Sequence, residues 1–446
     1  MDTKIGIACL AGTAIVLGGC ASLSKSPGYP QGYQIGENSA SADKGPVRLA
    51  RISYLSGPVT WRPTNSGNWS SASVNLPFRQ GAEIWVKPGS RAEIQFDDGS
   101  TLRLGGGADC VLQTLYSDDS GEFTEVQLTG GIGTLHALNK DSEYQFDTPL
   151  SSVRCYGPSE TRIGVAKAVE VACDSGQADV QGEQGQTVLH AKQMLDIDNA
   201  TSPYEVEAIP RPDPWDEFND HRDVIVEHHD LHVPRNIDLE AEDLDAYGSW
   251  HHDPHYGYVW APRVHAHWRP YHEGHWVWVD PWGWTWVDDE PWGWAPSHYG
   301  TWVDEPYGWC WDPGPAVQYW SPAVVDYCDD GADHLVAWCP LAPAEVVYPA
   351  AINIGFHTGN WWLDFSIGGC ADYYPVDPYH CRPYAWNNYY CNRDYNADFG
   401  AVYRNAYLAS DPVFVRHSRF IPVNGSRFAG LTTVSEAGFI HGGRFN

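Results

Sequence analysis

Short runs of alternating apolar and polar residues fill the chain from Val47 to about Asp198. A period of two places neighbouring side chains on opposite sides of a strand, so each run predicts a half-buried β-strand. The clearest runs are residues 51–55, 59–61, 91–96, 101–104 and 125–128. Turn-forming segments, such as residues 97–100, separate them. Residues 47–200 are therefore expected to form an all-β sandwich or a solenoid-like module.

An acidic connector follows at residues 201–246. Four prolines, the last of which is Pro214, open it. Proline is well tolerated in the first turn of a helix, so the pattern predicts one amphipathic helix from Trp215 to about His229.

A repeat with a period of about 26 residues occupies residues 247–350, where 14 of the 22 tryptophans lie between positions 250 and 320. Each unit begins with Gly-x-Trp, continues with Gly-aromatic-x-Trp or its close variant, and ends with Trp-x-Pro. The first landmark is at Gly248, Gly274 and Gly300, the second at Gly257, Gly283 and Gly308, and the third at Trp268, Trp294 and Trp320. A degenerate fourth copy is expected near residues 338–340.

Each unit is expected to be a small β element that buries its tryptophans against neighbouring units. Trp276, Trp278, Trp284 and Trp286 alternate with polar or smaller residues, so they are expected to share one face and to form core. Trp282 and Trp292 lie in Pro-Trp-Gly turns, which makes them the candidate exposed aromatics for ligand binding.

Five segments of the N-terminal module resemble the FecR periplasmic domain. They are residues 51–59, 81–85, 90–96, 128–132 and 146–149. The resemblance covers about a third of the chain and implies a β-rich sensing or protein-interaction module without catalytic residues. FecR-type regulators carry a cytoplasmic anti-sigma region and a membrane span before this domain, whereas here a lipoprotein signal occupies that place.

The tryptophan repeat is similar to an uncharacterised Trp-rich domain that follows FecR-like domains in bacterial envelope proteins. The similarity runs from residue 247 through Gly274-His275-Trp276-Val277-Trp278-Val279 to Trp292-Gly293-Trp294-Ala295-Pro296. It implies no biochemical activity.

Charge excludes one class of partner. The chain has 27 basic and 57 acidic residues and a net charge of -30. Such a surplus repels phosphate backbones, so nucleic acid is not expected as a partner. Most of the excess lies in residues 205–345, which hold 28 acidic residues against five arginines. The acidic character therefore belongs to the connector and the tryptophan repeat.

The N-terminal sequence predicts the cellular location of the protein. Residues 5–19 are apolar and too short to span a membrane, and they end at Leu17-Gly18-Gly19-Cys20, which resembles a bacterial lipobox. We expect a signal peptide at residues 1–19, a lipid on Cys20 and a flexible tether over residues 20–46. No Asp follows Cys20, which favours the outer membrane facing the periplasm; exposure on the cell surface is the alternative.

Nine cysteines remain of the 11 once Cys9 and Cys20 are set aside. Disulfides are the default in an exported protein, and Cys155 with Cys173 is the favoured pair because both lie in strand-like runs of one module. No Cys-x-x-Cys motif supports a redox pair or a zinc ribbon.

Histidines suggest a metal site, since 12 of the 19 lie between positions 221 and 298. His272 and His298 occupy equivalent places in the repeat and are expected to serve turns or hydrogen bonds. The metal candidates without counterparts in other units are His251, His252, His255, His265 and His267. Solvated histidines are the favoured interpretation, and no cofactor is expected.

Enzyme chemistry finds little support. Asp288-Asp289-Glu290 precedes a turn and is expected to be solvated, and Gly130-Gly131 predicts a bend because no helix follows it.

Residues 351–446 form a Tyr- and Cys-containing C-terminal region with a loosely ordered end. The sequence predicts a non-catalytic envelope protein that acts in protein interaction, sensing or as a scaffold, with an unidentified partner. The alternative is glycan, peptidoglycan or metal binding by the repeat domain.

Overall fold

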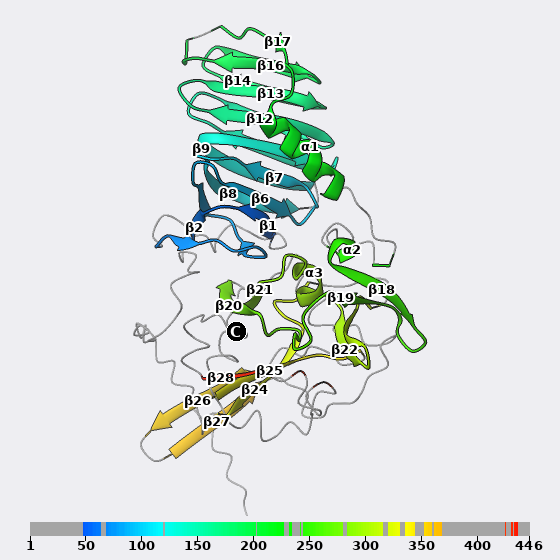
Figure 1. Cartoon of the computed structure of the whole chain (residues 1–446). Coiled ribbons are helices and arrows are strands. Elements are labelled where there is room, and N and C mark those ends of the chain that lie inside the picture. Colours follow the sequence, from blue (N-terminus) through cyan, green and yellow to red (C-terminus); the bar gives the residue numbers. More distant parts are fainter. Residues whose placement is uncertain are drawn as a thin grey trace, which may run out of the picture.

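The structure, a computed structural model, describes residues 48–63, 68–118, 121–201, 203–226, 232–233, 241, 244–279, 283–314, 320–330, 335–343, 352–358, 361–367, 424, 430 and 432–435. It is mainly β, with several separate sheets and three helices in this part of the chain, which confirms the expected fold class. A tall stack of strands forms one part, and a set of hairpins forms the other (Figure 1).

Two sheets packed face to face build the N-terminal module. Sheet A runs in the order β4 (Pro77–Phe78), β1 (Ala50–Ser56), β6 (Arg91–Phe96), β7 (Thr101–Leu104), β9 (Gly121–Ala137), β12 (Ser159–Val165), β13 (Val169–Ser175), β16 (Gln193–Ile197) and β17 (Glu207–Ala208). Sheet B runs in the order β3 (Ser70–Ser71), β2 (Val59–Pro63), β5 (Ala82–Val86), β8 (Asp109–Asp118), β9, β10 (Ser142–Asp147), β11 (Ser152–Tyr156), β14 (Gln177–Gly182) and β15 (Gly185–His190).

Strand β9 belongs to both sheets. Residues 122–127 pair in parallel with β10 in sheet B, whereas residues 131–137 pair with β12 in sheet A. The change of sheet falls at Gly130 and Gly131, and Gly131 has a φ of 78°. A Cβ on Gly131 would lie 2.2 Å from the amide nitrogen of Ala108, so only glycine fits. The expected bend is therefore a crossing point inside one long strand.

Alternation explains which side chains form the core between the sheets. In β2 and β10 every second residue is buried, as the period of two requires. The inward residues include Ile84, Leu102, Val126 and Val180, each fully buried. Burying side chains of this size contributes roughly 1.5–3 kcal/mol each before entropy costs.

Helix α1 (Pro214–Val226) packs on sheet A next to β7 and β12 (Figure 1). Pro214 occupies its first position, one residue before the expected start at Trp215, and the expected end near His229 lies outside the described residues. The Trp215 indole is largely buried and donates a hydrogen bond from Nε1 to Thr134 Oγ1 at 2.8 Å. The connector therefore contributes a packed element to the N-terminal module.

The repeat units of the second part are β-hairpins. They are β18 (Gly248–Asp253) with β19 (Gly257–Pro262), β20 (Gly274–Val279) with β21 (Gly283–Asp288), β22 (Thr301–Glu305) with β23 (Gly308–Asp312), and β24 (Val325–Asp330) with β25 (Leu335–Pro340). The last hairpin contains residues 338–340, where the degenerate fourth copy is expected. Helices α2 (Leu244–Tyr247) and α3 (Trp294–His298), strand β28 (Thr432–Ser435) beside β25, and a hairpin of β26 (Ile352–Thr358) with β27 (Trp361–Ile367) complete the described elements.

The repeated tryptophans face one another across each hairpin. Trp250 pairs with Trp260, Trp276 with Trp286 and Trp302 with Trp311. Five of these six are at most 2% exposed, and Trp250 is half-buried. The expectation of a tryptophan core is confirmed for these residues, whereas the side chains of Trp278 and Trp284 lie outside the described part.

The first glycine of each unit makes room for the indole of the second strand. A Cβ on Gly248 would lie 2.2 Å from Trp260, one on Gly274 would lie 2.5 Å from Trp286, and one on Gly300 would lie 2.7 Å from Trp311. Real Cβ atoms do not approach other atoms so closely, so glycine is required at all three positions. The Gly-x-Trp landmark therefore reflects one packing contact that is repeated three times.

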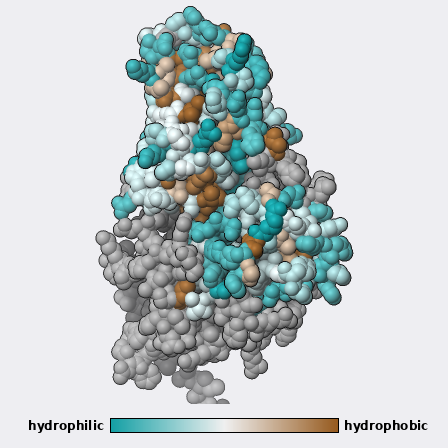
Figure 2. All heavy atoms as spheres, viewed as in Figure 1, coloured by the Kyte–Doolittle hydropathy of each residue, from teal (hydrophilic) through white to brown (hydrophobic). Residues whose placement is uncertain are grey.

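The surface seen in Figure 2 is mostly hydrophilic and is broken by small apolar patches. No helix in the described residues is both long enough and apolar enough to cross a membrane.

Candidate functional site

A buried charge cluster holds helix α1 against sheet A. Glu93 on β6 and Arg103 on β7 are both fully buried, and Arg103 Nε donates to Glu93 Oε2 at 2.8 Å. Arg222 of α1 donates to Glu93 Oε1 at 2.6 Å, and Ser53 Oγ donates to the same oxygen at 2.7 Å. Burial alone would raise the pKa of Glu93, but the hydrogen bonds and charges of Arg222 and Arg103 outweigh it and lower the pKa to about 2. The carboxylate is therefore ionised and fully engaged.

The same cluster extends to the end of the helix. Arg103 Nη1 lies 2.5 Å from Asp223 Oδ1, and His136 Nδ1 lies 2.7 Å from the same oxygen. Burial raises the pKa of Asp223, but His136 and Arg103 lower it more, so the pKa lies below its usual range. These groups neutralise one another between a helix and a sheet, which is a docking role.

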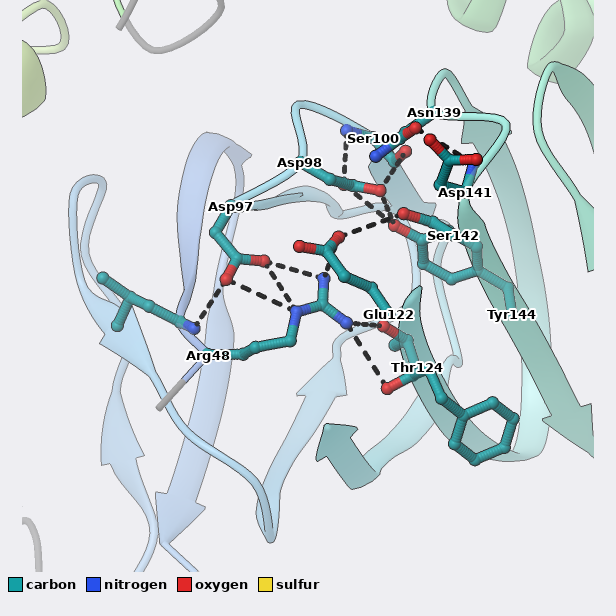
Figure 3. Close-up of polar contacts among 12 residues, drawn as sticks. Arg48, Asp97, Asp98, Ser100, Glu122, Thr124, Asn139, Asp141, Ser142 and Tyr144 are labelled. Carbon is teal, nitrogen blue, oxygen red and sulfur yellow. Dashed lines mark hydrogen bonds and ion pairs between the residues drawn. The ribbon is translucent and has the colours of Figure 1, made fainter. Parts of the chain in front are cut away.

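A second polar cluster surrounds Arg48, the first described residue of the N-terminal module (Figure 3). Arg48 Nη2 lies 2.7 Å from Asp97 Oδ1 and 3.5 Å from Glu122 Oε2, and Nη1 donates to Thr124 Oγ1 at 2.8 Å. Burial raises the pKa of Glu122 and Asp97 adds to the rise, while Arg48 opposes it. Arg48 therefore ties the beginning of β1 to β9, immediately after the expected tether.

Asp98 completes the polar contacts drawn in Figure 3. Its carboxylate accepts hydrogen bonds from the Tyr144 hydroxyl at 2.9 Å and from the Ser100 amide at 2.9 Å. Burial raises the pKa of Tyr144, and Asp98 raises it further, so the phenol stays protonated and donates. Asp98 thus fixes the turn that the sequence predicts between β6 and β7.

Asn75 joins the two parts of the molecule. It is fully buried with a φ of 63°, and its Nδ2 donates to the carbonyl oxygens of Asp288 at 3.1 Å and Glu290 at 2.7 Å. Arg51 donates to Asn75 Oδ1 at 3.2 Å, and its guanidinium lies 5.5 Å from the ring centre of Trp294. Sequence reasoning missed this joint, because Asn75 shows no local signal beyond its turn-forming type.

Asp288 is buried, so the expectation of a solvated Asp288-Asp289-Glu290 cluster is wrong at its first residue. It is 4% exposed, and its carboxylate accepts from Trp286 Nε1 at 3.0 Å, Ser297 Oγ at 3.3 Å and the Glu290 amide at 2.9 Å. Burial raises its pKa to about 7. The tryptophan packing of the hairpins encloses the carboxyl and the turn that follows it.

The expected structural role of His298 fits its surroundings. Its ring is 1% exposed, stacks on Trp320 with centroids 5.0 Å apart, and places Nδ1 2.7 Å from the Ser321 carbonyl oxygen. Burial lowers its pKa to about 3. His272 is half-buried, and burial lowers its pKa as well. Both rings are therefore neutral near pH 7.

The five metal candidates do not converge. His251, His252, His255, His265 and His267 are all exposed. Within the described part of the chain, no group of three or more His, Cys, Asp or Glu side chains could hold a metal ion. His251 packs against Tyr307, His252 against Tyr258, and His265 Nε2 lies 2.6 Å from Glu273 Oε1.

Three tyrosines are exposed on the hairpins β18–β19 and β22–β23: Tyr256 and Tyr307 lie near Asp253 and Glu305, and Tyr258 lies on the opposite face of β18–β19, against His252. Tyr256 is 40% exposed, Tyr258 48% and Tyr307 56%. Burial raises the pKa of Tyr256, and Glu305 and Asp253 raise it further, so both carboxylates lie close to the phenol. These three tyrosines therefore form part of the surface of this domain, whereas the repeated tryptophans, together with Tyr271 and Tyr299, form its core.

Two other predicted sites differ from the structure. Trp292 is only 4% exposed and lies edge-on to Trp260 at 4.8 Å, so it is not an exposed ligand contact. Trp282 lies outside the described residues.

Cys155 on β11 and Cys173 on β13 are buried free thiols, so the structure does not contain the disulfide predicted between them. Burial raises the pKa of Cys155 to about 12, which keeps its thiol protonated. Cys20 also lies outside the described residues.

Comparison with known proteins identifies one region. Residues 241–345 match a family described as "Family of unknown function (DUF6600)". The Trp-rich region is thus similar to an uncharacterised family, in keeping with the resemblance noted above, while no FecR family model matches the chain. No curated protein matches.

Two crystal structures of a protein described as a putative anti-sigma factor from Parabacteroides distasonis, at 1.65 and 2.50 Å resolution, are similar to part of the chain. Both are 14% identical to it, cover 36% of this chain and 73% or 72% of their own, and have a TM-score of 0.26. That score is too low to support any conclusion about function.

Proposed function

We propose that the protein is a non-catalytic, lipid-anchored component of the bacterial cell envelope that binds a partner protein, with residues 47–200 as a FecR-like sensing or interaction module. The main support is the division of aromatic residues in the Trp-rich domain. The paired tryptophans pack in the core, while Tyr256, Tyr258 and Tyr307 are exposed. Tyrosine is enriched among the residues that carry binding energy at protein interfaces.

Charge defines the partner that this surface suits. Asp253 and Glu305 lie beside Tyr256 and Tyr307, and the whole chain carries a net charge of -30. A phenol ring flanked by carboxylates attracts lysine and arginine side chains through cation–π and ionic contacts. The partner is therefore expected to present a basic patch.

Site-specific photocrosslinking tests this proposal in intact cells. A photoreactive amino acid at Tyr256 should capture a partner protein, whereas the same label at Tyr156, which is also 40% exposed but lies on sheet B, serves as the matched control. Tyr307→Ala should reduce the Tyr256 crosslink, because both phenols lie close to Asp253 and Glu305. Equal yields from positions 256 and 156, or an unchanged yield in Tyr307→Ala, would contradict the assignment.

The lipid anchor is tested separately. The Leu17-Gly18-Gly19-Cys20 segment supports acylation of Cys20, so a radiolabelled fatty acid should label the chain and the Cys20→Ala variant should lose the label. Persistent labelling of Cys20→Ala would exclude the lipobox. Membrane fractionation and protease treatment of whole cells then distinguish the periplasmic face of the outer membrane from the cell surface.

A further inference from the structure

Two indoles stand exposed on the outer face of sheet B. Trp69 is 42% exposed and Trp85 is 39% exposed, although tryptophan is usually buried in this protein. Trp85 belongs to β5, where Ile84 and Val86 on either side point inward and are fully buried. Its side chain therefore points away from the core.

Strand β2 separates the two indoles. Thr60 lies opposite Trp85 of β5 on one side and opposite Ser71 of β3 on the other. Trp69 precedes β3 and stacks on Arg62, whose guanidinium carbon lies 4.7 Å from the ring centre. Two strand spacings put the indoles about 10 Å apart on one flat face. Thr60 and Arg62 form the floor between them.

The face around Trp85 carries one ion pair and one further carboxylate. Arg62 and Glu83 form the ion pair at 2.5 Å, and Asp109, which lies opposite Trp85, accepts a hydrogen bond from Thr129 Oγ1 at 3.0 Å and keeps its negative charge. An anionic ligand is therefore repelled by this face as well as by the whole chain, which carries a net charge of -30, whereas an uncharged ligand is not.

We propose that Trp69 and Trp85 form a binding platform for an uncharged, extended polysaccharide. The negative face of an indole attracts the weakly positive C–H groups of a sugar ring. Thr60, Glu83 and Asp109 supply oxygen atoms that hydrogen-bond to sugar hydroxyl groups. Residues that dominate binding at protein–protein interfaces are normally surrounded by contacts that exclude water. Trp85 is flanked instead by the polar residues Thr60 and Asp109 on the neighbouring strands, which favours a glycan over a protein as its ligand. The platform places glycan recognition on the N-terminal module and not on the Trp-rich domain.

Co-sedimentation of the intact chain with insoluble chitin and with cellulose tests the platform. The parent protein should sediment with at least one of these uncharged polysaccharides. Trp85→Ala and Trp69→Ala should each weaken binding about tenfold, the loss expected for one stacking contact. Tyr156→Ala is the matched control, since Tyr156 is equally exposed at a distant position of the same sheet and its loss should leave binding unchanged.

Several results would overturn the platform: no sedimentation of the parent with either polysaccharide, equal loss in Tyr156→Ala, or equally tight binding to anionic alginate. A photoreactive amino acid at position 85 that captures a protein and no glycan would also overturn it. Both tryptophans are exposed, so the two variants should keep the parental melting temperature, which excludes unfolding as the cause of lost binding. The crosslink at Tyr256 is measured on another domain, so the two proposals fail independently.

Discussion

Glu93 is a carboxylate without solvent access, and it is tolerated because it has two guanidinium partners and a hydroxyl donor. Arg103 comes from a neighbouring strand, but Arg222 comes from a helix that follows 129 positions later. Desolvating a charge costs several kcal/mol, and only close, well-directed partners offset that cost. The cluster therefore makes the docking of α1 specific, because any other placement of the helix would leave a buried charge unpaired.

Glu93→Gln should destabilise the protein by about 3–5 kcal/mol near pH 7, because two buried guanidinium groups lose their counter-charge. The pKa of Glu93 is lower in the folded state than in the unfolded state, so its contribution is present above about pH 4.5 and is lost as the pH falls towards 2. Urea unfolding followed by circular dichroism at several pH values measures this. Glu143→Gln, which removes the exposed ion pair with Arg154, is the control and should cost less than 1 kcal/mol. A similar effect of both variants would contradict the assigned role.

Asp288 should give the opposite dependence on pH. Its folded pKa of about 7 lies above the ordinary value of 3.8, so the folded state binds the proton more tightly. The free energy of unfolding should therefore fall as the pH rises from about 4 to about 7, by up to about 4 kcal/mol from this group alone. Asp288→Asn should flatten the profile in that window. The comparison needs melting curves of both proteins at pH 5 and pH 8, and parallel profiles would refute the assignment.

Asp288 and His298 show how far the burial of a single side chain can be predicted from the local sequence. The place of His298 in the repeat predicts a structural ring, and the ring is buried against Trp320. The neighbours of Asp288 in the sequence are charged and suggest solvent, but Ser297 reaches its carboxyl from nine positions away and Trp286 covers it. Burial of Asp288 depends on the way helix α3 packs beside β21, which the local pattern does not contain.

At the scale of elements, the first three hairpins of the Trp-rich domain each contain one close contact between a glycine and an indole. Gly274→Ala places a Cβ 2.5 Å from both Trp286 and the Val287 carbonyl oxygen, and neither the indole of a packed core nor a strand backbone moves easily. The variant should lose about 3 kcal/mol of stability, measured by chemical unfolding with near-ultraviolet circular dichroism as the readout of tryptophan packing.

Gly164→Ala is the control for that substitution. Gly164 lies in β12, and its added Cβ would meet only the Glu170 Cβ at 3.6 Å, an ordinary contact. Its stability should stay the same or rise slightly, because alanine reduces the entropy of the unfolded chain. Equal losses in the two variants would show that the cost comes from replacing any strand glycine and not from the indole contact.

These elements also define how far the sequence determines the fold. The period of two predicts the strands of the sandwich, Pro214 predicts the start of α1, and the Gly-x-Trp spacing predicts the hairpins, because each signal is local. The switch of β9 between sheets and the place where α1 docks depend on pairings between residues far apart, such as Trp215 with Thr134. The exposed platform at Trp69 and Trp85 was missed for the same reason: alternation marks Trp85 as outward only once β5 has a known core face.

At the scale of the whole molecule, the two parts meet through backbone carbonyls. Asn75 donates both of its amide contacts to the turn after β21, while Arg51 orients the Asn75 side chain and covers Trp294. The N-terminal module and the Trp-rich domain are therefore joined by directed hydrogen bonds as well as by the chain. Because Asn75 has a φ of 63°, glycine can replace it and keep the backbone conformation while removing the amide.

Asn75→Gly should loosen this joint without unfolding either part. Losing the two hydrogen bonds should raise amide hydrogen exchange across residues 288–293 about tenfold, which corresponds to roughly 1.4 kcal/mol of lost local stability. Exchange in the core strands of sheet A should stay as in the parent, since glycine keeps the backbone hydrogen bond from residue 75 to the Ile52 carbonyl oxygen of β1. Asn199→Gly removes a side chain that bonds only within its own turn, to Thr201, and should leave residues 288–293 unchanged. If Asn75→Gly exchanges like the parent across that turn, the joint is held by the tryptophan contacts and not by Asn75.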